Sequence, residues 1–123
     1  MAKTVLVIDD DASVRDAFEL ILDDLGYQVR LAEDGLKGVD SVKEMRPDLI
    51  FLDLKMPNMN GIEVLHKLHE LDDSLKIYVV TAFAREFTLQ LEEAVAAGCK
   101  FELAAKPLGA EQIGIITQAA LGK

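Results

Sequence analysis

Residues 5–11 read Val5-Leu6-Val7-Ile8-Asp9-Asp10-Asp11, a continuous apolar run that ends in three acids. Two later runs have the same form, because residues 49–52 are apolar and lead into Asp53, and residues 77–80 are apolar and lead into Thr81. Short, continuous apolar runs bounded in this way are typical of strands that are buried on both faces. Such strands belong to parallel sheets covered by helices on each side. The three runs therefore predict a parallel β-sheet.

Segments with helical periodicity lie between and after these runs. The predicted apolar faces are Val14, Phe18, Ile21, Leu22 and Leu25; Leu36, Val39 and Val42; Ile62, Leu65 and Leu68; Phe87, Leu91, Ala94 and Val95; and Ile113, Ile116 and Ala120. Gly26 and Gly98 favour the ends of the first and fourth helices. Short strands at residues 28–32 and 101–105 complete a pattern in which strand and helix alternate five times. This (βα)5 pattern predicts an α/β fold with a parallel sheet.

The length and composition fit one globular domain. The 123 residues, half of them apolar, suit a single domain over residues 1–123, and we see no linker to an output domain. No apolar run approaches the roughly 20 residues that span a bilayer, and a secretory signal would not place three acids directly after so short an apolar core. The one cysteine, Cys99, fits a reducing compartment and is interpreted as a buried spacer. We expect a cytoplasmic protein without membrane insertion.

The acids outnumber the bases, and the formal net charge is −9. Binding to nucleic acid phosphates needs clustered Lys and Arg, so we expect no direct nucleic acid partner. The acids instead gather after the predicted strands. Ligands of open parallel sheets bind beyond the carboxyl ends of the strands. The residues at these ends are Asp9, Asp10, Asp11, Asp53, Thr81 and Lys106.

These residue types suit a phosphoryl group and a hard metal ion. Neighbouring carboxylates raise one another's pKa unless a cation lies between them, and Mg²⁺ prefers oxygen ligands. Lys106 adds a positive charge and Thr81 a hydroxyl donor, which together favour phosphoryl binding. Asp53 ends the strand expected at the centre of the sheet and is the favoured acceptor, because aspartyl phosphates are established covalent chemistry.

Simpler interpretations exist for each residue alone. The Asp9-Asp10 pair could cap the first helix, and Asp53 could be a turn or N-cap residue. The joint placement at four strand ends favours the phosphoryl site. His66 and His69 are three apart on the third helix, a spacing that permits a shared metal, although two surface histidines are the favoured interpretation.

Several motifs follow one another along the whole chain. They are the Val-Leu-Val-Ile-Asp9-Asp10 run, residues 47–57 around Asp53, the Gly61 turn, Val79-Val80-Thr81-Ala82, and Ala105-Lys106-Pro107. In these motifs the chain resembles the receiver domain of two-component response regulators. Residues 26–28 and 46–49 are especially similar to stand-alone receivers of phosphorelays, and the chain as a whole also resembles stand-alone receivers of the chemotaxis-regulator type. The resemblance implies a flavodoxin-like, doubly wound fold with strand order 2-1-3-4-5.

The resemblance also implies the metal ligands and the acceptor. Asp53 is the phosphorylated aspartate. Asp10 and Asp53 ligate Mg²⁺ directly, the backbone carbonyl of Lys55 adds a ligand, and Asp9 acts directly or through water. Mn²⁺ is expected to substitute for Mg²⁺.

The remaining site residues receive roles by the same resemblance. Thr81 binds a phosphoryl oxygen and reports its presence, and Ala82 is the small residue that leaves the phosphoryl group access. Lys106 contacts the phosphoryl group, and its bond to Pro107 is typically cis. The face formed by the fourth helix, fifth strand and fifth helix then repacks.

The chain departs from the family pattern in three places. The usual Met-Asp-Gly turn reads Met59-Asn60-Gly61, and Asn keeps the capacity to cap a helix. The segment from Thr81 to Lys106 is longer than usual by about three residues, which loops tolerate at modest cost. The family also places an aromatic switch residue three before the lysine. Here Leu103 stands at that position, and Phe101 either takes over the role in a shifted register or the aromatic switch is missing.

The implied function is a phospho-accepting signalling switch rather than an enzyme, with only self-catalysed transfer and hydrolysis. The donor is a phosphohistidine on a sensor histidine kinase or histidine phosphotransfer protein, and the output is a downstream protein target. We expect a monomer, with dimerisation on phosphorylation as the alternative state. Lys55 and Phe83 would flank the approach of water, so the bulk of Phe83 predicts slow hydrolysis.

Two rival functions stay open at this point. A degenerate receiver would act through protein contacts without taking phosphate, but it would lack the acceptor or the lysine. A phosphatase of the haloacid-dehalogenase kind would need an Asp-x-Asp nucleophile after the first strand and a cap domain. Residues 9–11 contain such a triplet, but the chain leaves no room for a cap.

Overall fold

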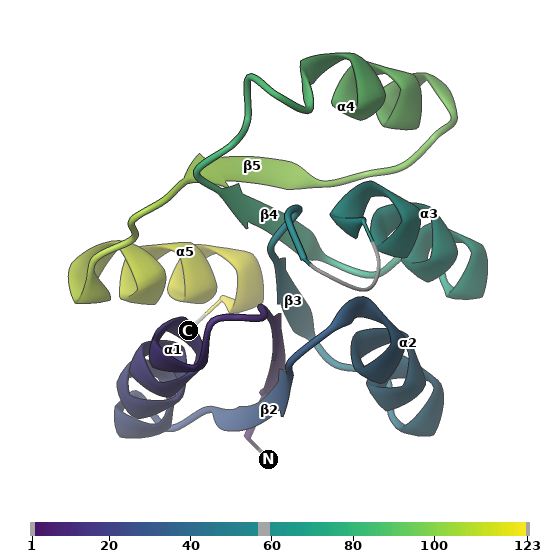
Figure 1. Ribbon diagram of the computed structural model, residues 1–123. Helices are drawn as coiled ribbons and strands as arrows, with labels where there is room; N and C mark the ends of the chain where they lie inside the picture. Colours follow the sequence, from purple (N-terminus) through teal and green to yellow (C-terminus); the bar gives the residue numbers. More distant parts are fainter. Residues whose placement is uncertain (1, 57–59, 123) are drawn as a thin grey trace.

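Within the described residues, 2–56 and 60–122, the computed structural model contains five parallel strands in the order β2-β1-β3-β4-β5 (Figure 1). The strands are β1 Thr4–Ile8, β2 Gln28–Ala32, β3 Leu49–Leu52, β4 Ile77–Thr81 and β5 Glu102–Ala105. The helices are α1 Ala12–Asp24, α2 Gly35–Glu44, α3 Gly61–Leu71, α4 Thr88–Ala96 and α5 Ala110–Leu121. The predicted fold class, the alternation of strand and helix and the strand order are confirmed.

The pleat of the sheet divides its side chains between two cores. Leu6 and Ile8 of β1 pack with α2, α3 and α4, whereas Val5 and Val7 pack with α1 and α5. Figure 1 shows α1 and α5 together on one side of the sheet, with α2 and α3 on the other. Successive strand residues point to opposite faces, so a continuous apolar run is needed to fill both cores.

The register brings the carboxyl ends of the strands to one edge. Ile8 of β1 pairs with Leu52 of β3, and the Asp53 N–H donates to the Ile8 carbonyl at 3.0 Å. On the other side of the sheet centre, Thr81 pairs with Ala105. The residues that follow each strand therefore lie on a common rim.

The edge strands differ in burial from the three strands whose apolar runs predicted burial on both faces. Residues of β2 and β5 are largely exposed or half-buried, because each of these strands has a neighbouring strand on one side only. Full burial is confined to β1, β3 and nearly all of β4.

Three residues predicted on apolar helical faces are exposed instead. Leu25, the C-cap of α1, is 43% exposed, Leu36 in the first turn of α2 is 56% exposed, and Val95 in α4 is 61% exposed. The first two lie at helix ends, beyond the part that meets the sheet. Because α4 lies at the edge of the sheet, it buries only a narrow stripe that contains Leu91 and Ala94.

The chain between β4 and α4 is taken up by consecutive turns. The N–H groups of Glu86, Phe87 and Thr88 donate to the carbonyls of Phe83, Ala84 and Arg85. Phe87 therefore precedes α4 rather than lying within it, although it is buried in the core as its spacing predicted. Among the described residues, every helix is too short or too polar to cross a bilayer.

Candidate functional site

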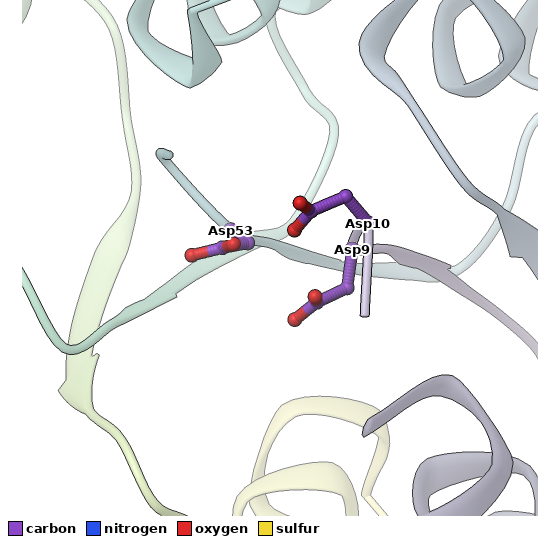
Figure 2. A group of neighbouring side chains, drawn as sticks. All are labelled: Asp9, Asp10 and Asp53. Atoms are coloured by element: carbon purple, nitrogen blue, oxygen red, sulfur yellow. The ribbon is translucent and has the colours of Figure 1, made fainter. Parts of the chain in front are cut away.

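Three aspartates converge on the rim. Asp9 follows β1, Asp53 follows β3, and one carboxylate oxygen from each of Asp9, Asp10 and Asp53 lies within 4.8 Å of the others. Figure 2 shows the three side chains around a common space. Asp9 and Asp53 are buried, whereas Asp10 is exposed. The structure thus brings together the carboxylates that were predicted to bind a metal.

The start of α1 is capped by the third acid of the run. The Asp11 carboxylate accepts from the Ser13 N–H at 2.9 Å and from the Ser13 hydroxyl at 2.7 Å. These hydrogen bonds satisfy a free N–H of the first helical turn. The alternative that the Asp9-Asp10 pair caps this helix is therefore wrong, and both of those carboxylates are left for the rim.

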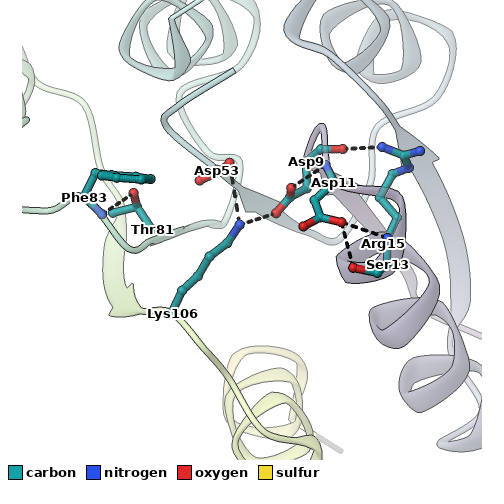
Figure 3. Close-up of polar contacts among 8 residues, drawn as sticks. All are labelled: Asp9, Asp11, Ser13, Arg15, Asp53, Thr81, Phe83 and Lys106. Atoms are coloured by element: carbon teal, nitrogen blue, oxygen red, sulfur yellow. Dashed lines mark hydrogen bonds and ion pairs between the residues drawn. The ribbon is translucent and has the colours of Figure 1, made fainter. Parts of the chain in front are cut away.

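A lysine faces the aspartates from the neighbouring loop. The Lys106 ammonium donates to Asp9 Oδ2 at 2.7 Å and lies 3.6 Å from Asp53 Oδ2 (Figure 3). The bond from Lys106 to Pro107 is cis, as expected. Burial alone would lower the pKa of Lys106, but the hydrogen bond to Asp9 and the charge of Asp53 outweigh it, so the pKa is raised. The ammonium therefore stays charged.

The electrostatics of the rim favour a cation. Burial, followed by the charge of Asp9, raises the pKa of Asp53 to about 6, against the opposing charge of Lys106. One ammonium thus leaves three crowded carboxylates only partly neutralised. Mg²⁺ is a hard cation that is commonly held by one or two carboxylates and by water, so the donor set fits it.

A hydroxyl and an aromatic ring lie at the end of β4. Thr81 is buried, and its Oγ1 accepts from the Phe83 N–H at 3.0 Å. The Lys55 ammonium lies 4.2 Å from the centroid of the Phe83 ring and 3.6 Å from Glu86 Oε2. Ala82 is exposed between Thr81 and Phe83. These contacts join the loop after β3 to the loop after β4.

The pairing of β4 with β5 places the two candidate switch residues. Leu103 pairs with Val79, two residues from the rim residue Thr81, whereas Phe101 lies before the first residue of β5. Phe101 packs against the core, and Leu103 is 49% exposed. Leu103 stands three residues before the lysine, and which of the two residues acts in the switch stays a prediction.

Sequence reasoning missed Arg15. Its Nη1 donates to the Asp9 backbone carbonyl at 2.7 Å, which ties the first turns of α1 to the acidic segment (Figure 3). Arg15 lies four residues after Asp11, but no pattern in the sequence indicates a bond from its side chain to the Asp9 backbone.

The start of α3 agrees with the expectation for the variant turn. The Asn60 side chain caps the helix by accepting from the Ile62 N–H at 2.7 Å. The first residue of the variant turn Met59-Asn60-Gly61 lies outside the described residues, as do residues 57 and 58.

The chain has close relatives of known type. A family model described as response regulator receiver domain matches residues 5–116. Sporulation initiation phosphotransferase F of Bacillus subtilis is 32% identical over 113 residues, which cover 92% of this chain and 89% of that protein. Response regulator MprA of Mycobacterium tuberculosis is 42% identical over 82 residues, which cover 67% of this chain but 36% of that longer protein.

Solved structures agree with these sequence matches. Chemotaxis protein CheY4 of Vibrio cholerae superimposes with a TM-score of 0.85 at 27% identity, over 98% of this chain and 100% of that one. A CheY-like receiver domain of Methanospirillum hungatei gives a TM-score of 0.84 at 28% identity, over 98% and 94% of the two chains. Sequence and fold agree over nearly the whole chain, which therefore belongs to the response regulator receiver domain family of two-component and phosphorelay signalling.

Proposed function

We propose that this receiver domain accepts a phosphoryl group on Asp53 from a phosphohistidine of a histidine kinase or phosphotransfer protein. One observation carries the proposal: carboxylate oxygens of three aspartates lie within 4.8 Å of one another, and the Lys106 ammonium contacts two of them. Asp10 and Asp53, with Asp9 and the Lys55 carbonyl, would hold Mg²⁺, for which Mn²⁺ could substitute. When bound, this ion neutralises phosphoryl oxygens.

The chemistry assigned to the chain's own residues is an in-line displacement. An Asp53 oxygen attacks phosphorus, the bond from phosphorus to the donor imidazole breaks, and an acyl phosphate forms. With a pKa of about 6, Asp53 is largely ionised at neutral pH, as a nucleophile must be. Lys106 balances charge on the transferred oxygens, and Ala82 leaves the group room.

The response assigned to the switch begins at Thr81. Its hydroxyl now accepts from the Phe83 N–H and would turn toward a phosphoryl oxygen, which releases that hydrogen bond. Because Thr81 pairs with Ala105, a shift of Thr81 reaches β5 and the exposed Leu103. The face formed by α4, β5 and α5 would then repack without an aromatic switch residue and present a changed surface to a downstream protein.

Beryllium fluoride with Mg²⁺, an analogue of the phosphoryl group, tests the proposal. We expect saturable binding that is lost in Asp53→Asn and retained in Asp40→Asn, which removes an exposed acid of α2. No binding by the unmodified chain would instead indicate a degenerate receiver, and turnover of small phosphate esters would indicate an enzyme. We also propose that the free protein is a monomer in the cytoplasm; sedimentation of the free and bound forms tests the first point, and fractionation of cells tests the second.

The Phe83→Ala variant is expected to shorten the lifetime of the phosphoryl group. The Phe83 ring lies under the Lys55 ammonium, and we propose that these two residues flank the path of an attacking water. Its removal should speed hydrolysis roughly three- to tenfold, or about 0.7–1.4 kcal/mol of barrier. Decay of the radiolabelled acyl phosphate measures this rate, with Leu89→Ala on the exposed surface of α4 as control. An unchanged lifetime would contradict the assignment.

A further inference from the structure

The only cysteine of the chain lies against a histidine. Cys99 is buried, and its Sγ is 3.7 Å from Nδ1 of His66. His66 belongs to α3, and Cys99 lies in the segment that connects α4 to β5, which passes beside α3 in Figure 1. The two ligand-type side chains thus meet across two elements that are distant in sequence.

The backbone places the thiol firmly. Gly98 turns the chain at the end of α4 with a positive φ of 95°, and the Cys99 N–H donates to the Ala94 carbonyl at 3.0 Å. Because Cys99 has no second cysteine to pair with, its thiol is available for metal binding. The position of Sγ is therefore set by the turn rather than by a disulfide.

The separation of the two atoms suits a shared tetrahedral metal. Zinc lies about 2.3 Å from a cysteine sulfur and about 2.0–2.1 Å from a histidine nitrogen. At a tetrahedral angle these lengths place sulfur and nitrogen about 3.6 Å apart. The 3.7 Å between Cys99 Sγ and His66 Nδ1 is close to that value.

Two more residues that could bind a metal, His69 and Glu70, lie on the same side of α3. His69 follows His66 by three residues, and its Nε2 is 3.8 Å from the place that a β-carbon on Gly98 would occupy. The charge of Glu70 acts on the Cys99 thiol and adds to the rise in its pKa that burial causes. Among the described residues only the rim aspartates already place three ligand atoms within 4.8 Å, so His69 or Glu70 must turn to complete this second site.

We propose that Cys99, His66 and His69 form a binding site for a zinc-class divalent cation, with Glu70 or water as the fourth ligand. Binding replaces the thiol proton, which is released to solvent, with a sulfur–metal bond. The ion would tie α3 to the chain that enters β5. A thiolate and imidazoles select zinc-like ions, whereas the carboxylates of the rim select magnesium, so the two sites take different metals.

Cobalt(II), added with excess Mg²⁺, tests the site because a sulfur–cobalt bond absorbs strongly in the near ultraviolet. The Asp53→Asn chain is used, so that the rim contributes less. We expect one cobalt per chain with this absorption, displaced by zinc. The absorption should be lost in Cys99→Ser and in His66→Gln, weakened in His69→Gln, and retained in Lys67→Gln, which alters an exposed residue of the same helix.

Two results would overturn the proposal: the absence of the sulfur–cobalt absorption, or its persistence in His66→Gln. Circular dichroism of each variant confirms that it is folded, and the histidine variants keep the test meaningful if Cys99→Ser does not fold. Beryllium fluoride binding should be unchanged in His66→Gln with Asp53 present. Failure of this second metal site is therefore distinguishable from failure of the phospho-acceptor proposal.

Discussion

Replacing Gly61 by alanine is expected to lower the free energy of unfolding by about 3 kcal/mol, at the upper end of the cost of overpacking. A β-carbon on Gly61 would lie 2.4 Å from the Leu54 Cα and 2.6 Å from the Asp53 carbonyl oxygen. Both are backbone atoms, which cannot rotate aside as the end of a side chain can. The Gly61 N–H also donates to the Leu54 carbonyl at 2.8 Å, so the two segments are held together at this point.

The same substitution is expected to weaken Mg²⁺ binding. Relief of the overlap requires α3 and the chain after β3 to move apart, and that chain carries Asp53 and the Lys55 carbonyl. Urea denaturation in the absence of metal measures the loss of stability, and a Mg²⁺ titration of the variant measures the loss of affinity. The two effects share one cause and should appear together.

Two other glycines serve as matched controls. A β-carbon on Gly38 would lie 2.5 Å from Cδ1 of Ile8, the flexible end of a side chain, so Gly38→Ala should cost less than Gly61→Ala. A β-carbon on Gly114 would lie 3.4 Å from the Leu25 side chain, and Gly114→Ala should gain up to about 1 kcal/mol from helix propensity. A Gly61→Ala variant as stable as the Gly114→Ala variant would contradict the prediction.

Convergence of the rim residues was predictable because it depends only on the direction of the strands. Asp9 and Asp53 each follow a continuous apolar run, and parallel strands that fill two cores must end at the same edge. The strand order places β1 beside β3, which completes the approach. Spacing along the chain placed these residues at one edge of the sheet, and the strand order, which the family resemblance implied, brings the carboxylates close to Lys106.

Other features depended on contacts that periodicity does not encode. Leu36 and Val95 have helical spacing but lie where no neighbouring element covers them, because a repeat of 3.6 residues defines a side of a helix and not its surroundings. The positions of Leu103 and Phe101 relative to Thr81 required the pairing of β4 with β5. The bond from Arg15 to the Asp9 carbonyl is between a side chain and the backbone, and no pattern of residue types specifies it.

Asp53→Asn is expected to stabilise the metal-free chain at neutral pH, although it removes the acceptor. The pKa of Asp53 is raised from 3.8 to about 6 in the folded state, so the folded chain binds more protons than the unfolded chain between these values. Stability therefore falls as pH rises from about 4 to about 6, and the full deficit remains above that window. The neutral side chain of Asp53→Asn removes this deficit in stability.

The size of the gain follows from the same shift. A pKa rise of about 2 corresponds to at most about 3 kcal/mol in the free energy of unfolding. Solvent screening at the rim reduces the expected gain in stability to about 1–2 kcal/mol. Lys106 keeps its hydrogen bond to Asp9 at 2.7 Å in the variant, so loss of Asp53 leaves no buried ammonium unpaired. Removing one of several crowded carboxylates is thus favourable.

Magnesium should reverse the order of the two chains. At about 100 times the dissociation constant, a ligand that binds only the folded state adds about 2.7 kcal/mol. Wild type has the acceptor carboxylate and should gain this stability, whereas Asp53→Asn should gain little. Urea unfolding at pH 4 and pH 7.5, with chelator or with Mg²⁺, measures how the stability difference between the two chains depends on pH and on the metal. The Asp40→Asn variant controls for the loss of an exposed charge. If Asp53→Asn were no more stable than wild type in chelator at pH 7.5, burial of Asp53 and repulsion by Asp9 would not destabilise the metal-free site, and the prediction would be wrong.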